Sequence, residues 1–289
     1  MGGWSVDRIP DQTGRRYVIT GANSGIGAEM AKVLAAAGAH VTMACRNLDK
    51  AAVVANQIGS AASIAHLDLA DLSSVREFAD TVDSVDVLIN NAGVMALPMS
   101  RTVDGFEMQM GTNHLGHFAL NGLLLPKVTD RVVTLSSLAH LIGSIHPDDL
   151  NWERRRYNRW TAYGDSKLAN LVFAQELARR LTAAGSPLRS VVAHPGYATT
   201  DLMMHSETAV DYLMKAGALL RVGQTADRGA LPAVYAATED VPTGSYWGPS
   251  MVLRGGPSSA RYRGVADNQA VRDRLWEASE KLTGVTIEV

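Results

Sequence analysis

The feature that most constrains this chain of 289 residues is a glycine-rich segment, TGANSGIG, at positions 20–27. It follows a short apolar segment at 17–20 and precedes a stretch whose apolar residues share one face of a helix: Ile26, Met30, Val33, Leu34 and Ala37. Glycine allows a sharp turn there, and the free N–H groups at the start of a helix favour an anion such as a pyrophosphate. We therefore expect the turn to bind a dinucleotide through Gly21, Asn23, Ser24, Gly25, Ile26 and Gly27. A glycine-rich turn that binds no ligand is the alternative.

The rest of the chain continues this alternation of strand and helix. Short apolar segments predict buried parallel strands at 17–20, 41–44, 63–67, 85–90, 131–135 and 190–193, with helical patterns between them. We expect the α/β class, with a single doubly wound, Rossmann-type domain over residues 1–289 and helices on both faces of a parallel sheet of about seven strands. The polar stretch at 143–161 and the stretch at 243–263, which is rich in Gly, Pro and Ser, predict surface loops. A helix-prone stretch at 201–222 predicts a mobile flap over the substrate.

Composition excludes several classes of partner and location. Lys and Arg number 27 against 29 Asp and Glu, so the chain lacks the basic footprint of a nucleic-acid-binding protein. Cys45 is the single cysteine, which fits a reducing compartment. The sequence has neither an apolar run of 18 residues nor a signal peptide at its start, so we expect a cytoplasmic protein without a membrane span. His114 and His117 have no Cys or carboxylate cluster beside them, so we expect no metal.

The end of the second strand indicates which nucleotide binds. Many dinucleotide folds carry an acidic residue there for the ribose hydroxyls, but this chain has Arg46 and Asn47. A guanidinium group suits the 2′-phosphate of NADP, so NADP(H) is preferred over NAD(H). A solvated surface arginine is the alternative.

Further candidates for cofactor binding follow later strands. Asp68, with Leu69, follows the third strand, and its carboxylate either bonds the adenine amino group or caps the helix that begins near Asp71. Small residues after the fourth strand let the backbone pass close to the cofactor, in the sequence Asn90, Asn91, Ala92 and Gly93. After the sixth strand, Pro195 and Gly196 turn the chain past the expected nicotinamide position, and Thr200 is spaced to bind the carboxamide.

Candidate catalytic residues occur at the fifth strand and the helix after it. Tyr163 and Lys167 lie one helical turn apart, on one face of the helix. A nearby ammonium group favours the phenolate and lowers the pKa of a tyrosine, which can then exchange a proton with a substrate oxygen. Ser137 ends the fifth strand and could hold a carbonyl oxygen beside the tyrosine. Asn113 lies in a helical stretch, 108–124, and could hold a water molecule or the backbone near the lysine.

Together, these motifs resemble the classical short-chain dehydrogenase/reductase family, in family order over roughly residues 16–200: TGANSGIG, Asp68-Leu69, NNAG, Asn113, Ser137, the Tyr163–Lys167 pair and HPGYATT. The segments ACRN, TNHLGHF, VVTLSSLAH and YGDSKLANLVFAQELARRL further resemble the retinol dehydrogenase and protochlorophyllide reductase-like branch. That resemblance implies NADP(H), Tyr163 as proton donor or acceptor, and Lys167 on the ribose and the tyrosine. It also implies Ser137 on the substrate oxygen and Asn113 in a proton relay.

The predicted function is an NADP(H)-dependent oxidoreductase that interconverts a carbonyl and an alcohol on an apolar small molecule. Apolar side chains suggest the pocket: Val94, Met95, Leu97, Met99, Leu202, Met203 and Met204. The alternatives are a non-catalytic NADP(H)-sensing protein and a sugar-nucleotide epimerase or dehydratase. The 26 residues from Ser137 to Tyr163 indicate an insert near 138–161, beside a helix that many family members use for tetramer packing. We therefore expect a monomer or a homodimer.

Overall fold

The computed structural model describes residues 4–197, 224–262 and 264–289. Its centre is one sheet in the order β3-β2-β1-β4-β5-β6-β7-β8, in which β1 to β7 are parallel and β8 runs antiparallel to β7. The strands are β1 (Arg16–Thr20), β2 (His40–Cys45), β3 (Ala62–His66), β4 (Val85–Asn90), β5 (Val128–Leu135), β6 (Arg189–Ala193), β7 (Tyr246–Pro249) and β8 (Pro257–Ser259). The predicted doubly wound α/β fold is confirmed, and the six predicted strands correspond to β1 to β6.

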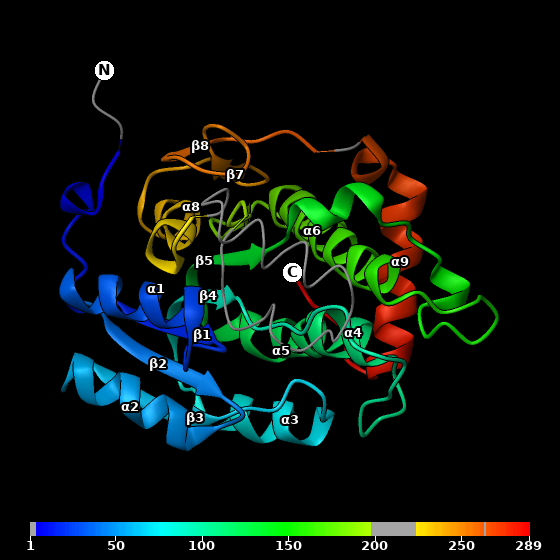
Figure 1. Cartoon of the computed structure of the whole chain (residues 1–289), viewed down its shortest axis with the longest axis horizontal. Coiled ribbons are helices and arrows are strands. Elements are labelled where there is room, and N and C mark those ends of the chain that lie inside the picture. The colour runs from blue at the N-terminus through cyan, green and yellow to red at the C-terminus, as the bar shows by residue number, and fades with distance from the viewer. Residues whose placement is uncertain (1–3, 198–223, 263) are drawn as a thin grey trace.

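Helices cover both faces of the sheet (Figure 1). One core cluster joins the sheet to α1 (Gly25–Ala36), α2 (Leu48–Ile58) and α8 (Ala226–Thr238). The other joins it to α3 (Leu72–Thr81), α5 (Gly116–Leu124), α6 (Arg159–Ala183) and α9 (Gln269–Thr283). The chain order reverses at β1, which pairs with β2 on one side and β4 on the other. In such sheets the ligand crevice lies at the carboxyl ends of the strands beside this reversal.

Short helices connect these elements. They are η1 (Val6–Arg8), α4 (Met108–Met110), η2 (Gly111–Leu115), η3 (Leu125–Lys127), η4 (Leu138–Ile142), η5 (Pro147–Asp149) and η7 (Gly264–Asp267). The helical stretch predicted at 108–124 is divided, because η2 is a π-helical turn between α4 and α5. Every residue of η2 is buried. π-helical turns are rare and often occur at functional sites.

The two stretches that were predicted to be surface loops are more ordered than expected. The stretch at 243–263 contains β7 and β8, so its interpretation as a surface loop is wrong. The insert, residues 138–161, is irregular but packed: Trp152 is buried, and the guanidinium of Arg155 lies 3.8 Å from the centre of its ring. The flap predicted at 201–222 lies outside the described residues.

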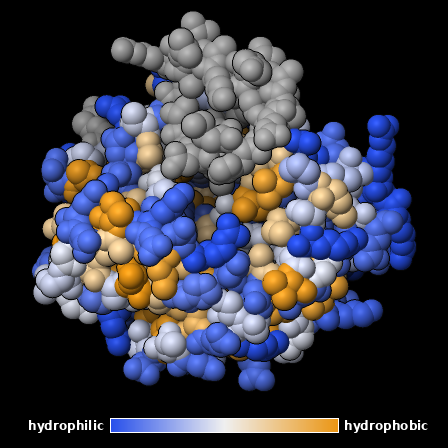
Figure 2. Space-filling model, turned by 60° about the horizontal axis from the view of Figure 1, so that its bottom comes forward, coloured by the Kyte–Doolittle hydropathy of each residue, from blue (hydrophilic) through white to orange (hydrophobic). Residues whose placement is uncertain are grey.

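Among the residues that the structure describes, no helix is both long enough and apolar enough to cross a membrane. In the space-filling view, apolar side chains occur in small groups separated by hydrophilic ones (Figure 2).

Candidate active site at the carboxyl edge of the sheet

A cleft of about 380 Å³ lies where the parallel strands end. Its walls include the predicted residues Gly21, Asn23, Ser24, Gly25, Ile26, Gly27, Arg46, Asn47, Asp68, Leu69, Ala92, Gly93, Ser137, Tyr163, Lys167 and Pro195. Asn91 of the segment after the fourth strand and the predicted pocket residue Val94 also line it, whereas sequence reasoning missed other lining residues: Ala44, Lys50, Leu67, Thr112, Leu135 and Ser136. Most of these adjoin predicted ones at strand ends, so the strand boundaries were the signal for them.

The glycine-rich turn forms one end of the cleft. Gly25 has a φ of +53°, and a Cβ atom on Gly27 would lie 2.4 Å from the carbonyl oxygen of Gly21 and 2.6 Å from Nδ2 of Asn91. Thr20 ties the glycine-rich turn to the segment after β4, because its Oγ1 accepts hydrogen bonds of 2.9 Å from the N–H groups of Asn91 and Ala92. Backbone therefore approaches the cleft closely at positions where a side chain has no room.

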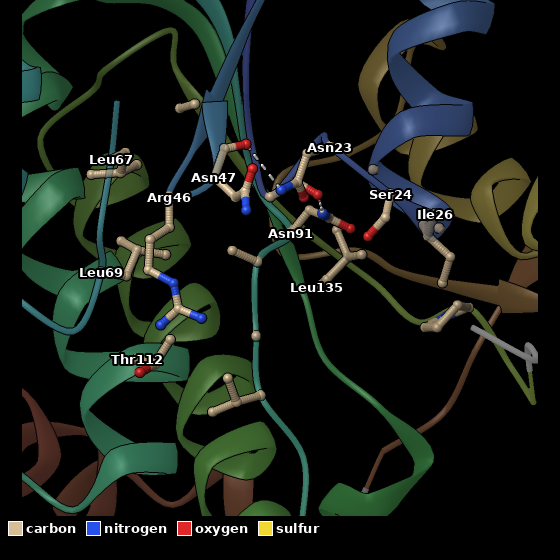
Figure 3. Close-up of a pocket in the computed structure, with 18 of the residues that line it drawn as sticks. Asn23, Ser24, Ile26, Arg46, Asn47, Leu67, Leu69, Asn91, Thr112 and Leu135 are labelled. Carbon is tan, nitrogen blue, oxygen red and sulfur yellow. Dashed lines mark hydrogen bonds between the residues drawn. The ribbon is translucent and has the colours of Figure 1, made fainter. Parts of the chain in front are cut away.

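Two cations stand beside this turn. Arg46 and Lys50 are exposed, and their side chains make no hydrogen bond or ion pair with any described residue. Asn47 caps α2 by accepting from the N–H of Lys50 at 2.9 Å, and Nδ2 of Asn23 donates to its carbonyl oxygen at 3.4 Å (Figure 3). Figure 3 shows the Arg46 side chain extending from the end of β2 toward Leu69 and Thr112. Because Lys50 lies on the next helix, the strand-end pattern that pointed to Arg46 did not reveal it.

Asp68 does not cap a helix. Its Oδ1 accepts from the N–H of Ala70 at 2.9 Å, whereas Oδ1 of Asp71 caps α3 by accepting from the N–H of Ser73 at 2.8 Å. The capping alternative for Asp68 is therefore wrong. Asp68 remains a predicted adenine contact at the cleft.

The residues after β4 divide between the cleft and the core. Ala92 and Gly93 line the cleft, whereas Asn90 is buried and its Nδ2 donates to Oγ1 of Thr134 at 3.2 Å. Asn91 holds the strand end, because its Nδ2 donates to the carbonyl oxygen of Thr20 at 2.7 Å.

Tyr163 and Lys167 lie in the N-terminal part of α6, which begins at Arg159 and whose first turn is capped by Oδ1 of Asn158. Both are buried, at 6% and 5% exposed, and the ammonium of Lys167 lies 5.9 Å from the centre of the Tyr163 ring. Burial raises the pKa of Tyr163 to about 12, and a side-chain hydrogen bond with Ser137 acts in the opposite direction. Burial also lowers the pKa of Lys167 to about 8. The predicted lowering of the Tyr163 pKa by Lys167 is therefore not found, since burial and Ser137 are the causes that act on this pKa.

Ser137, rather than Ser136, meets the tyrosine. Ser137 lowers the pKa of Tyr163, and its hydroxyl accepts from the N–H of Ala139 at 3.2 Å. Oγ of Ser136 donates to the backbone carbonyl of Lys167 at 2.8 Å and is occupied there.

Asn113 lies in the π-helical turn, fully buried behind the cleft rather than in its lining. Its Oδ1 accepts from the N–H of Val94 at 2.7 Å, and its Nδ2 donates to the carbonyl of Val94 and to Oγ of Ser166, both at 2.9 Å. A Cβ atom on Gly93 would lie 3.1 Å from Oδ1 of Asn113 and 3.4 Å from Nζ of Lys167. Asn113 thus fixes the loop that passes the lysine.

The two histidines of this stretch have partners in the core. Nδ1 of His117 lies 2.9 Å from the carbonyl oxygen of Asn113, which can only accept, so this nitrogen carries the proton and Nε2 accepts from Oγ1 of Thr20 at 2.9 Å. Burial lowers the pKa of His117 to about 4, so it is neutral at pH 7. His114 bonds Oγ of Ser279 at 2.9 Å.

After β6, Pro195 lines the cleft, and Gly196 turns away from it with a φ of +68°. The N–H of Gly196 donates to Nδ1 of His194 at 3.2 Å. Thr200, Leu202, Met203 and Met204 lie outside the described residues.

Comparison with known proteins gives this architecture a family. The model of the short chain dehydrogenase family matches residues 15–211. Retinol dehydrogenase 11 of Homo sapiens is 39% identical over 288 residues, which cover 95% of this chain and 87% of that protein. Retinol dehydrogenase 13 of Homo sapiens is 47% identical over 206 residues, or 67% of this chain, and the match spans 62% of that protein's length. The solved structure of an uncharacterized protein from Mycobacterium paratuberculosis is 49% identical, with a TM-score of 0.88 and both chains covered completely. The chain therefore belongs to the short-chain dehydrogenase/reductase family of oxidoreductases, in its retinol dehydrogenase-like branch.

Proposed function

We propose that this protein is an NADP(H)-dependent oxidoreductase that interconverts a carbonyl and an alcohol on an apolar small molecule. The observation that carries the proposal is the group formed by Tyr163, Ser137 and Lys167 in one wall of a cleft whose other end is the glycine-rich turn. The family binds NAD(P) and acts on small molecules, which supports the general reaction class.

The donor set of the cleft fits a dinucleotide. The backbone cradle at Gly21, Gly25 and Gly27 leaves room for a pyrophosphate at the N-terminus of α1, a helix of 12 residues. Asn23, Asp68 and Lys167 supply polar groups along the same cleft. When bound, the nicotinamide cofactor supplies the hydride that adds to the carbonyl carbon during reduction.

The chain's own residues supply the proton and the orientation. Ser137 donates a hydrogen bond to the substrate oxygen and holds it beside the Tyr163 hydroxyl. A pKa of about 12 keeps Tyr163 protonated at neutral pH, so it can deliver a proton to the oxygen as the carbonyl becomes an alcohol. The ammonium of Lys167 lies beside the ring and stabilises the phenolate that remains.

The two ends of the cleft support the proposed cofactor preference and the proposed apolar substrate. Arg46 and Lys50 present two cations at the adenosine end, where the extra phosphate of NADP(H) carries negative charge. Val94 and Leu135 are among the apolar side chains that line the cleft, and Met95 and Ala96 pack against Tyr163 without lining it. These side chains favour an apolar substrate. The cytoplasmic location and the monomer or homodimer stay predictions.

The test is Tyr163→Phe, assayed with NADPH and a panel of apolar aldehydes and ketones. Loss of the phenolic proton should lower turnover at least about 100-fold. NADPH affinity, measured by fluorescence titration of the same variant, should stay within a few-fold of the wild type. A variant that keeps its turnover contradicts the proposal, and a variant that loses NADPH binding contradicts the division of roles.

A further inference from the structure

One wall of the candidate active site holds a backbone conformation that needs support. The wall segment, residues 94–97, follows β4 and places Val94 in the cleft and Met95 and Ala96 against Tyr163. Ala96 has a φ of +52°, in the left-handed region that an alanine enters at a cost of about 1–2 kcal/mol. Such a conformation persists only where neighbouring groups hold it.

Three side chains hold the wall segment by its backbone. Asn113 binds both polar groups of Val94, as described above. Oε1 of Gln109 accepts from the N–H of Ala96 at 2.7 Å, directly at the strained residue. The hydroxyl of Tyr157 lies 3.0 Å from the carbonyl oxygen of Leu97 and 3.0 Å from Oε1 of Glu107, so these two acceptors share its one proton.

Tyr157 belongs to the insert, is half-buried, and is the centre of a cluster with two buried side chains that we call the brace: Glu107, Gln109 and Tyr157. Nε2 of Gln109 donates to the Tyr157 hydroxyl and to the carbonyl oxygen of Arg159, both at 2.9 Å. Oε1 of Glu107 lies 3.0 Å from the same hydroxyl. Glu107 and Gln109 are 0% exposed and Tyr157 is half-buried, so bulk water reaches these bonds only from the Tyr157 side.

The insert is anchored to α6 without the Tyr157 hydroxyl. Nη1 of Arg155 lies 3.2 Å from Oδ2 of the buried Asp165, Nε of Arg155 lies 2.9 Å from Oδ2 of Asp149, and its guanidinium covers Trp152. The N–H of Ser144 also donates to Oδ1 of Asp165 at 2.7 Å. The insert therefore does not depend on the Tyr157 hydroxyl for its attachment to α6, and the hydrogen bonds of this hydroxyl act on the wall segment.

We propose that Tyr157 is a positioning residue, which acts through Gln109 and Leu97 to fix the wall segment beside Tyr163 and so determines which carbonyl substrates are accepted. The inference rests on the proposed function and gives the insert its part in it. A wall segment that is already held in one conformation loses less conformational entropy when a substrate binds against it. It therefore favours substrates that are large enough to fill the pocket. Small substrates that do not reach the wall gain nothing from it.

The test is Tyr157→Phe, which removes one hydroxyl and keeps the ring that lies edge-on to Trp152 at 5.5 Å. The matched control is Tyr262→Phe, since the Tyr262 hydroxyl also donates to a carboxylate, Oδ1 of Asp267 at 3.0 Å, but outside the cleft. Hydrogen exchange of the amides at 94–97 should be about tenfold faster in Tyr157→Phe than in the control. In a series of aldehydes of increasing size, KM for the large ones should rise about tenfold, while kcat for the smallest and the Kd of NADPH stay within about twofold.

A second variant keeps the inference falsifiable. Gln109→Met removes the bond to Ala96 directly, and the effects of Gln109→Met and Tyr157→Phe on KM should be less than additive because both act through one network. Equal exchange and equal KM values in Tyr157→Phe and Tyr262→Phe overturn the inference. A uniform fall of kcat with all substrates, together with weaker NADPH binding, also overturns it, because the hydroxyl would then support the fold as a whole. If the wild type reduces no carbonyl, the proposed function fails, and the exchange of 94–97 still decides whether the brace holds the wall.

Discussion

Arg46 is the side chain that we expect to contribute most to the choice between NADPH and NADH. It stands at the end of β2, exposed and beside Lys50, with no carboxylate in the described chain paired to either. A cation that is not neutralised by the protein is available to a phosphate, whereas NADH offers a ribose hydroxyl in the same place.

We predict that Arg46→Ala lowers the preference for NADPH over NADH about tenfold, which corresponds to about 1.4 kcal/mol. Lys50→Ala should lower it less, because an ammonium is a point charge that lacks the two-pronged geometry of a guanidinium. The control is Lys32→Ala, which lies on α1 in an ion pair with Glu29. Fluorescence titration with both nucleotides measures the ratio, and an unchanged ratio in Arg46→Ala removes this residue from cofactor selection.

Among the elements of the described chain, α9 is the helix that packs over α5 and α6. Trp276 is 2% exposed; its ring stacks on Phe173 at 5.7 Å, meets Phe118 edge-on at 5.3 Å and lies beneath Arg180 at 4.1 Å. Val285 continues the cover, since it contacts α5 at Gly122. α9 therefore buries apolar surface of both helices within the chain.

Trp276→Ala should lower the free energy of unfolding by about 3–5 kcal/mol, because the cavity removes contacts with two aromatic rings. Val53→Ala is the control, since Val53 is 61% exposed on α2 and should change stability by less than about 0.5 kcal/mol. Urea unfolding measures both. The Kd of NADPH should stay the same in folded Trp276→Ala, because no residue of α9 is among those lining the cleft.

The elements also show what the sequence could and could not predict. β1, β2, β4, β5 and β6 are short, apolar and mostly buried, so their pattern was sufficient. β3 was also located correctly, but its predicted burial is wrong, because it lies at the edge of the sheet and none of its residues is fully buried. β7 was missed because Gly248 and Pro249 are typical of turns; Gly248 is needed there, since a Cβ atom on it would lie 1.9 Å from Nε2 of His194. That contact joins distant segments and leaves no local pattern.

The same distinction applies within the candidate site. Tyr163 and Lys167 lie one turn apart and the glycines lie in one loop, so local spacing predicted them. The brace joins residues that are 48 to 60 positions apart, and no periodicity links Tyr157 to Leu97 or to Gln109. The π-helical turn was also not predictable, since its residues follow the apolar pattern of an ordinary helix.

At the scale of the whole molecule, stability and function compete at Lys167. Its ammonium is buried, and no carboxylate in the described part of the chain pairs with it. Its pKa falls from the usual 10.5 to about 8, so between these values the unfolded chain holds a proton that the folded protein has lost. The free energy of unfolding attributable to Lys167 therefore rises with pH from about 8 to 10.5 and is constant below that window.

Lys167→Met should accordingly be more stable than the wild type at pH 7, by about 2–3 kcal/mol, while losing turnover. The difference should shrink by about 1 kcal/mol between pH 7 and pH 9, as the wild type is relieved of its buried charge. Comparing the two proteins by urea unfolding at each pH cancels the contributions of Tyr163 and Cys45, whose raised pKa values act on both alike. A difference that grows with pH contradicts the assignment.

The π-helical turn η2 separates two helical faces that serve different parts of the molecule. Such a turn holds one residue more than the α-helical turn it replaces, which rotates the following residues by about 100°. Gln109, before the turn, meets the insert, whereas His117 and Phe118, after it, meet β1 and α9. In genetic terms, this is the length of a single codon. Loss of one codon within 111–115 would turn this segment into a regular helix and break the hydrogen bonds between Asn113 and Val94. The reading frame would be kept, but the active site would lose its geometry.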